Sequence, residues 1–194
     1  MTTFRCFWLE PTGRAAQSVL VDCSACNHYT RRDLGEVPFS EGEPRTSWSE
    51  FDWPTACEKC GHVFEFDNED WRSSKREAIL RRVDTGEVGT VDSFGPGAMW
   101  DATWMGRKGP DGRSLVVRLP GDHDWHVDSI CANCNMREVE HQCWQREGEV
   151  PNVTIVGGPP GHAGGGSVWA DSPDGWHGFL KRGYLQEATD PEPP

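Results

Sequence analysis

The C-terminal half of the chain alternates apolar and polar positions over short runs, which predicts strands separated by turns. Ser114–Leu119 (SLVVRL) predicts one strand, and the alternation in Trp125–Ser129 and the apolar run Val153–Val156 predict two more. The segment His177–Leu185 predicts a hairpin that turns at Arg182-Gly183, since such turns favour glycine. These elements describe a domain of short strands.

One segment, Asp67–Thr85, has the features of a helix. Acidic residues are concentrated at its start and basic residues at its end, which suits the helix dipole, and Glu77 and Arg81 stand at i,i+4. Gly86 and Gly89 follow and would end the helix. The sequence therefore predicts a single connecting helix.

The N-terminal third has less periodicity. Pro38, Gly42 and Pro44 interrupt any regular pattern, and Val63–Phe66 predicts one short strand. We expect a mainly β protein of the α+β type, in which an N-terminal zinc ribbon is joined by a helix to a small Gly/Trp-rich β domain. The predicted parts are a zinc-ribbon-like module (1–66), a connecting helix (67–90), a β domain (91–188) and a disordered tail (189–194).

Composition narrows the class of protein. The chain carries 22 Gly and 10 Trp, which favours turns and strands over helices. Its formal net charge of -12 opposes binding to nucleic acid, and no apolar run reaches the roughly 18 residues of a membrane span. With no N-terminal run of signal length, the eight cysteines suggest metal ligands rather than disulfides. We expect a cytoplasmic protein that binds neither nucleic acid nor membrane.

Two Cys-x-x-Cys pairs about thirty residues apart are the strongest motif. Each pair can place two thiolates on one tight turn, and two such turns make a tetrahedral site for a structural zinc ion. Asn27 and Gly61 follow the two pairs, and both residue types tolerate the left-handed conformation that closes such a turn. The predicted ligands of this first site are Cys23, Cys26, Cys57 and Cys60.

A second set of cysteines allows a mixed site for another structural zinc ion, so one or two ions are expected. Its predicted ligands are Cys131, Cys134, His141 and Cys143. The histidines that compete for the fourth position are His123, His126 and His162. The alternative is that these cysteines are small buried thiols, which is also the interpretation of Cys6.

Candidate nucleophilic chemistry lies near the C-terminus. Three glycines precede Ser167, and backbone N–H groups of Gly166 and Ser167 could form an oxyanion hole. A strand, a turn and a returning strand could set His177 beside Ser167 as its base, with Asp128 as the acid that orients the imidazole. The alternative is a flexible loop with an incidental serine and a histidine that is part of the core.

An ordered series of short motifs extends over this region. The motifs are Gly112-Arg-Ser-Leu-Val-Val117, Trp125-His-Val-Asp-Ser129, Asn133-Cys134, His141-Gln-Cys-Trp144, Gly-x-Gly-Ser167-Val168 and Trp176-His-Gly-Phe-Leu180. The series resembles a bacterial family, long labelled a domain of unknown function, of serine peptidases encoded beside ubiquitin-like proteins and their conjugating enzymes. The match covers roughly Gly95 to Leu185 and excludes the first zinc site.

The resemblance implies a serine peptidase that matures a ubiquitin-like protein at its C-terminus or releases it from conjugates. It carries the nucleophile to Ser167 and the base to His177, and it aligns Asp128 with the aspartate of the strand motif. The chain departs from the family in Pro159–Ala163, where many members have a Cys- and Ala-rich approach to the serine. The alternative function is a noncatalytic zinc-ribbon adaptor that binds a partner protein.

Overall fold

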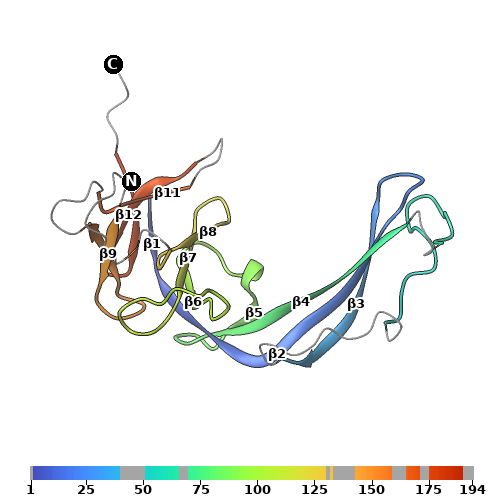
Figure 1. Cartoon of the computed structure of the whole chain (residues 1–194), viewed down its shortest axis with the longest axis horizontal. Coiled ribbons are helices and arrows are strands. Elements are labelled where there is room, and N and C mark those ends of the chain that lie inside the picture. The colour runs from blue at the N-terminus through green and yellow to red at the C-terminus, as the bar shows by residue number, and fades with distance from the viewer. Residues whose placement is uncertain are drawn as a thin grey trace, which may run out of the picture. The chain divides into compact units, whose positions relative to one another are not determined.

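The computed structural model describes residues 2–39, 51–65, 70–129, 132, 143–158, 165–170 and 175–189. The described chain is mainly β, as predicted (Figure 1), and its one helix is the short 3-10 turn η2. The elements are β1 (Thr3–Arg5), β2 (Phe7–Asp22), β3 (Tyr29–Pro38), β4 (Trp71–Arg82), β5 (Val88–Thr90), η2 (Val91–Ser93), β6 (Ala98–Asp101), β7 (Leu115–Leu119), β8 (His123–His126), β9 (Trp144–Glu147), β10 (Thr154–Gly157), β11 (Ser167–Trp169), β12 (His177–Lys181) and β13 (Tyr184–Glu187).

The chain forms two compact units. The larger unit comprises Met1–Glu10 and Arg81–Pro194, and the smaller unit comprises Pro11–Leu80. These limits differ from the predicted boundaries after residues 66 and 90. The first ten residues belong to the larger unit because β1 pairs with β13 and the start of β2 pairs with β6.

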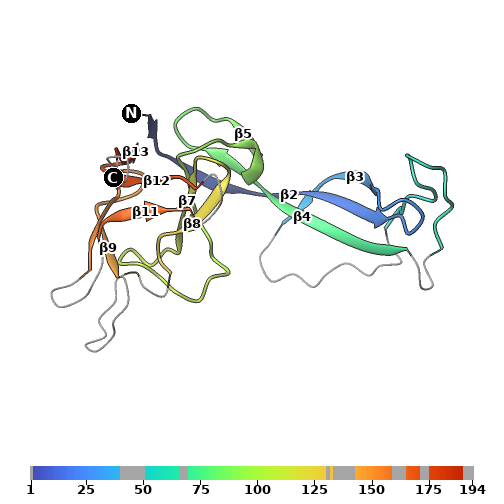
Figure 2. The same cartoon turned by 90° about the horizontal axis from the view of Figure 1, so that it is seen from above.

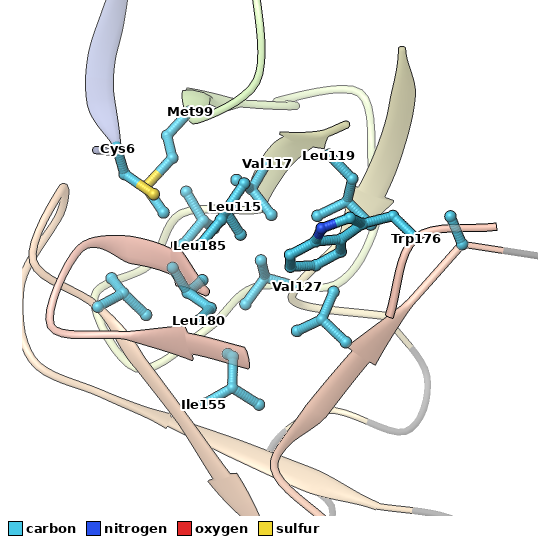
Figure 3. Packing of buried hydrophobic residues seen from close by; sticks show 13 residues of the cluster. Cys6, Met99, Leu115, Val117, Leu119, Val127, Ile155, Trp176, Leu180 and Leu185 are labelled. Carbon is cyan, nitrogen blue, oxygen red and sulfur yellow. The ribbon is translucent and has the colours of Figure 1, made fainter. Parts of the chain in front are cut away.

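The larger unit is built around one hydrophobic core. Its four-stranded antiparallel sheet has the order β1-β13-β12-β11, and β6, β7 and β8 form a second antiparallel set. Leu180 and Leu185 from the first sheet meet Leu115 and Val117 of β7 and the ring of Trp176 (Figure 3). All five residues of β7 are buried; four of them are apolar, and the fifth, Arg118, is paired with Asp92 and Asp124.

The predicted hairpin at His177–Leu185 is confirmed as β12 and β13. Arg182 and Gly183 both have positive φ values, of 49° and 75°, as a type I′ turn requires. A Cβ atom on Gly183 would lie 2.7 Å from the Pro151 carbonyl oxygen, so the close approach of this backbone also requires glycine. The turn therefore fixes the register between β12 and β13.

Three long strands run side by side in the smaller unit (Figure 2), where β2 pairs with β3 on one side and with β4 on the other. The β2–β3 register shifts between Gln17 and Ser18, where Leu34 has no partner and Gly35 takes a φ of 83°. This is the geometry of a β-bulge, which increases the local twist. The buried Val19 and Val21 continue the alternation of β2 toward the first cysteine pair.

The predicted connecting helix is wrong, since Trp71–Arg82 is strand β4. The charges that suggested helical pairs fit a strand equally well: Lys75 Nζ lies 2.9 Å from Glu77 Oε1, between residues two apart on one face. Ile79 and Leu80 are buried. Gly86, with a φ of 77°, belongs to the turn into β5 instead of ending a helix.

Smaller predictions also need correction. Val63 makes only an isolated bridge with Ala56, so the part of the Val63–Phe66 strand that the structure describes is not formed. The strand predicted over Trp125–Ser129 is β8, which ends at His126, and Asp128 lies in the following turn. Residues 190–194 of the predicted tail lie outside the described residues. None of the helices in the described part of the chain has the length and the apolar character that spanning a membrane requires.

Candidate functional sites

The first cysteine pair forms a tight turn at the end of β2. The N–H of Asn27 donates to the carbonyl of Cys23 at 2.8 Å, and the N–H of Cys23 donates to the carbonyl of His28 at 3.0 Å. Asn27 takes a φ of 52°, in the left-handed region that asparagine tolerates. This backbone brings Cys26 to the same side of the turn as Cys23.

The second cysteine pair repeats this turn. Gly61 N–H donates to the Cys57 carbonyl at 2.9 Å, Cys57 N–H donates to the His62 carbonyl at 2.8 Å, and Gly61 has a φ of 75°. The two turns thus have the same pattern of hydrogen bonds, and each has a residue in the left-handed conformation followed by a histidine.

The two turns bring all four predicted ligands of the first site together. The sulfurs of Cys23, Cys26, Cys57 and Cys60 lie within 4.8 Å of one another. The Cys23–Cys60 and Cys26–Cys57 sulfur distances are both 3.7 Å, too long for disulfides. Zn–S bonds of about 2.3 Å in a tetrahedron would set the sulfurs about 3.8 Å apart, so the cluster could hold a metal ion such as zinc.

The thiols of the cluster differ in acidity. Burial raises the pKa of Cys26 to about 12. Burial also acts to raise the pKa of Cys57, but hydrogen bonds from backbone N–H groups of Cys60 and Lys59, and from neighbouring thiols, lower it to about 6. Because a metal binds thiolates, occupying the site must displace the protons held by the high-pKa thiols.

Asp70 links the two turns. Its Oδ1 accepts hydrogen bonds from the backbone N–H and the hydroxyl of Ser24, both at 3.0 Å, in the first turn. Its Oδ2 lies 3.2 Å from His62 Nε2 in the second turn and accepts from Glu65 N–H at 2.9 Å. Burial acts to raise the pKa of Asp70, but the backbone and side-chain hydrogen bonds outweigh it and lower the pKa to about 2. The carboxylate is therefore ionised and fixed.

Replacing Asp70 with asparagine is expected to weaken metal binding by about 10- to 100-fold. One of the two carboxylate oxygens, which both accept hydrogen bonds, would become an amide NH₂ group that cannot accept one. Competition with a chromophoric chelator measures the affinity. Glu58→Gln is the matched control, because the Glu58–His28 contact is largely exposed and should matter little. Equal affinities for the Asp70 variant and the wild type would contradict this role.

Sequence reasoning missed Asp70 and the histidines after each turn. The signal was present in the parallel motifs Cys23-Ser-Ala-Cys-Asn-His28 and Cys57-Glu-Lys-Cys-Gly-His62. His28 Nε2 lies 3.0 Å from Glu58 Oε1 of the opposite turn, and His62 contacts Asp70. His62 thus joins its own turn to the carboxylate that holds the first turn, whereas the His28–Glu58 contact between the turns is exposed and contributes little.

Most of the second predicted zinc site, namely Cys131, Cys134 and His141, lies outside the described residues. Cys143 is described and is fully buried immediately before β9, where the backbone of Gly158 passes close to it. Cys6 is part of the larger unit's core, and burial raises its pKa to about 12. The second site stays a prediction.

Ser167 and His177 lie on neighbouring antiparallel strands. Ser167 opens β11 and pairs with Phe179, while His177 opens β12 and pairs with Trp169. The two residues are therefore diagonal neighbours on one face of the sheet, a relation in which side chains stand roughly 7 to 8 Å apart or less. Ser167 is exposed and His177 is half-buried.

The backbone of Ser167 is directed away from β12. Ala170 N–H donates to the Trp176 carbonyl at 2.9 Å, which fixes the alternation of the ladder, because bonded and non-bonded pairs alternate along antiparallel strands. The pairs Ser167–Phe179 and Trp169–His177 are therefore the ones without backbone hydrogen bonds between the two strands. The N–H groups of Ser167 and Trp169 consequently point away from β12, toward the outer edge of β11. A Cβ atom on residue 166 would lie 2.6 Å from the Ile155 carbonyl oxygen, so the close approach of these backbones requires glycine at this position.

Asp128 belongs to a buried ion pair. Its Oδ1 accepts from Arg146 Nε at 2.9 Å and its Oδ2 accepts from Leu115 N–H at 2.8 Å. Arg146 also contacts Asp111, and both side chains of the Asp128–Arg146 pair are almost fully buried. These contacts give Asp128 a structural role, and its assignment as the acid of a triad stays a prediction.

Replacing Asp128 with asparagine is expected to destabilise the protein by about 3 kcal/mol, because it leaves the buried Arg146 guanidinium without its full charge partner. Urea unfolding followed by fluorescence measures the loss. Asp84→Asn is the control, since the Asp84–Arg82 pair is more exposed and should cost well under about 1 kcal/mol. Unchanged stability with lost peptidase activity would instead favour the triad role.

Four of the chain's tryptophans, Trp100, Trp104, Trp169 and Trp176, have different environments. Trp176 is buried and lines a hollow of about 340 Å³ beside His177, together with Gly121 and Gly175. Trp169 is 61 % exposed on β11. Trp100 is buried near the Arg118 guanidinium, and Trp104 is 71 % exposed. Only Trp176 is therefore a wall residue of the hollow at His177.

Comparisons of the chain with protein-family models, with curated proteins and with solved structures found no match. Function is therefore inferred from the geometry of the described residues.

Proposed function

We propose that the protein is a zinc-stabilised serine peptidase that processes a ubiquitin-like protein at its C-terminus or removes it from conjugates. The observation that supports this most is the pairing of β11 with β12, in which Ser167 and His177 share one face on neighbouring strands. A nucleophilic serine needs a base that can reach its hydroxyl, and such contacts are often loose before substrate binds.

In the proposed reaction, Ser167 Oγ attacks the carbonyl carbon of the scissile bond while His177 takes the hydroxyl proton. The tetrahedral oxyanion accepts hydrogen bonds from the backbone N–H groups of Gly166 and Ser167. His177 then gives the proton to the leaving amine, and water hydrolyses the acyl-enzyme by the same route in reverse. Since both oxygens of Asp128 accept hydrogen bonds elsewhere, the proposal depends on Ser167 and His177 alone.

In this proposal the four cysteines hold one structural zinc ion, which supplies folding free energy and takes no part in the reaction. The donor set of four sulfurs and the 3.7 Å separations support zinc over harder cations, which prefer oxygen ligands. A second zinc ion at Cys131, Cys134, His141 and Cys143 is retained as part of the proposal. The partner is the ubiquitin-like protein, with no nucleic acid or membrane involved, and the compartment is the cytoplasm.

The test is incubation with the ubiquitin-like protein that the resemblance implies is encoded beside this chain, made with a C-terminal extension and followed by intact mass. Loss of the extension with wild-type protein, and its retention with Ser167→Ala, is the expected result. An intact substrate in the presence of folded, metal-loaded wild-type protein would contradict the proposal.

A noncatalytic adaptor is the second candidate, and one observation favours it. Three large apolar side chains beside the cysteine turns are exposed, namely Tyr29, Val63 and Trp71, at 58 %, 66 % and 63 %. Exposed apolar side chains grouped in this way are typical of protein-binding surfaces. If the adaptor is correct, a Ser167→Ala variant keeps every activity, and substitution of Trp71 removes partner binding.

A further inference from the structure

The outer edge of β11 is the feature of the larger unit that the proposed reaction does not explain. The four-stranded sheet ends at β11, and no strand in the described part of the chain pairs with that edge. The ladder alternation derived from Ala170 and Trp176 directs the N–H groups of Ser167 and Trp169 outward along it. An edge of this kind can accept an extended chain as an added strand.

The face beside this edge is aromatic and exposed. Trp169 is 61 % exposed on β11, Phe179 lies opposite Ser167 on β12, and Tyr184 is 41 % exposed on β13. A hollow of about 460 Å³ opens on this face and is lined by Thr154, Lys181, Arg182, Tyr184 and Gln186. The face therefore offers aromatic rings beside Ser167 and, farther along the sheet at the β12–β13 turn, a hollow that could anchor a side chain.

The charge of the face is opposite to the charge of the chain. Its outward positions on the four strands are Thr3, Arg5, Ser167, Trp169, His177, Phe179, Lys181, Tyr184 and Gln186. These described positions include two permanent cations and no carboxylate, although the chain has a formal net charge of -12. The Lys181 ammonium lies 4.4 Å from the centre of the Phe179 ring. Because Phe179 is the residue that pairs with Ser167, this cation–π contact keeps the positive charge close to Ser167.

We propose that the outer edge of β11 and the face bearing Trp169, Phe179 and Lys181 bind an extended polypeptide segment that carries carboxylate side chains. The segment pairs with β11 through its backbone, rests on the aromatic rings and meets Lys181 with an acidic residue. This inference rests on the proposed function, because the segment would be the part of the substrate protein that Ser167 attacks. It adds the substrate's charge and its binding geometry.

A polypeptide fits this surface better than a nucleic acid does. Nucleic-acid affinity depends on neutralising several phosphates, and this face has two permanent cations in an acidic chain. The outward N–H groups of β11 instead match the carbonyl spacing of an extended peptide. Nucleic-acid binding is therefore an outcome that would overturn the proposal.

The experiment uses the full-length Ser167→Ala protein, so that binding is measured without turnover. The probe is a short fluorescein-labelled peptide of alternating Glu and Val, and its binding is measured by fluorescence anisotropy. Three labelled comparison ligands are measured in the same way: a Lys/Val peptide, the Glu/Val peptide N-methylated at alternate residues, and single-stranded DNA. We expect binding of the Glu/Val peptide alone. Adding Lys181→Glu should weaken it about tenfold, whereas Lys108→Glu, an exposed lysine elsewhere in the larger unit, should leave it unchanged.

Three results would overturn the docking proposal: equal binding of the Glu/Val and N-methylated peptides, no effect of Lys181→Glu, or tighter binding of DNA. Failure of the proposed reaction would be distinguished by a small fluorophosphonate probe, which needs no docked segment. Labelling of Ser167 without peptide binding would sink the docking proposal alone. Peptide binding without labelling would leave the surface but remove the reaction.

Discussion

Replacing Cys57 with serine should weaken metal binding by about a hundred- to a thousandfold and unfold the smaller unit. Structural zinc sites contribute about 10 to 16 kcal/mol at neutral pH, so each of four ligands is worth roughly 2.5 to 4 kcal/mol. The cluster around the site contains Val21, Phe64 and the ligands Cys23 and Cys57, so little apolar packing remains without the metal. Hydrogen exchange of residues 11–80 and elemental analysis measure the two effects.

Cys6→Ala is the control for this prediction, because Cys6 is buried in the core of the larger unit. It should lower stability through lost packing and leave one metal ion at the four-cysteine site. A chelator should reproduce the Cys57→Ser effect in the wild type, with loss of amide protection in residues 11–80 and retention in β6, β7 and β12. Wild-type protein that is free of metal yet fully protected in residues 11–80 would contradict the metal's structural role.

Ser167→Ala and His177→Ala should each lower kcat/KM by at least about a thousandfold, with metal content and unfolding midpoint unchanged. Removing a nucleophile or its base disables one shared step, so the double variant should be no slower than either single variant. Kinetics on the extended ubiquitin-like substrate measure this. Ser93→Ala is the control, since Ser93 is an exposed hydroxyl of the larger unit that lies in η2, outside this sheet.

Near-wild-type rates for Ser167→Ala would remove this residue as the nucleophile. Strongly additive losses in the double variant would indicate that the two residues act separately, against a shared proton transfer.

Local signals allowed part of the fold and of the metal site to be predicted. The Cys-x-x-Cys spacing with a left-handed residue after each pair determines a turn within six residues, and both turns form as expected. The same holds for the β12–β13 hairpin, where Arg182-Gly183 determines the turn. Such features need no knowledge of the rest of the chain.

Non-local pairing could not be predicted in the same way. The charges of Trp71–Arg82 suit a helix and a strand alike, and its pairing with β2, more than fifty residues earlier, decides the outcome. Asp70 gains its role only when it contacts Ser24 and His62 together. Asp128 looked available as an acid until Arg146, eighteen residues away, was placed beside it.

The most direct test of the central claim is labelling of folded, metal-loaded protein with a fluorophosphonate, followed by peptide mapping. The account predicts one adduct, on Ser167, that is absent in Ser167→Ala and strongly reduced in His177→Ala. No adduct on wild-type protein, or an adduct on another residue that persists in Ser167→Ala, would contradict it.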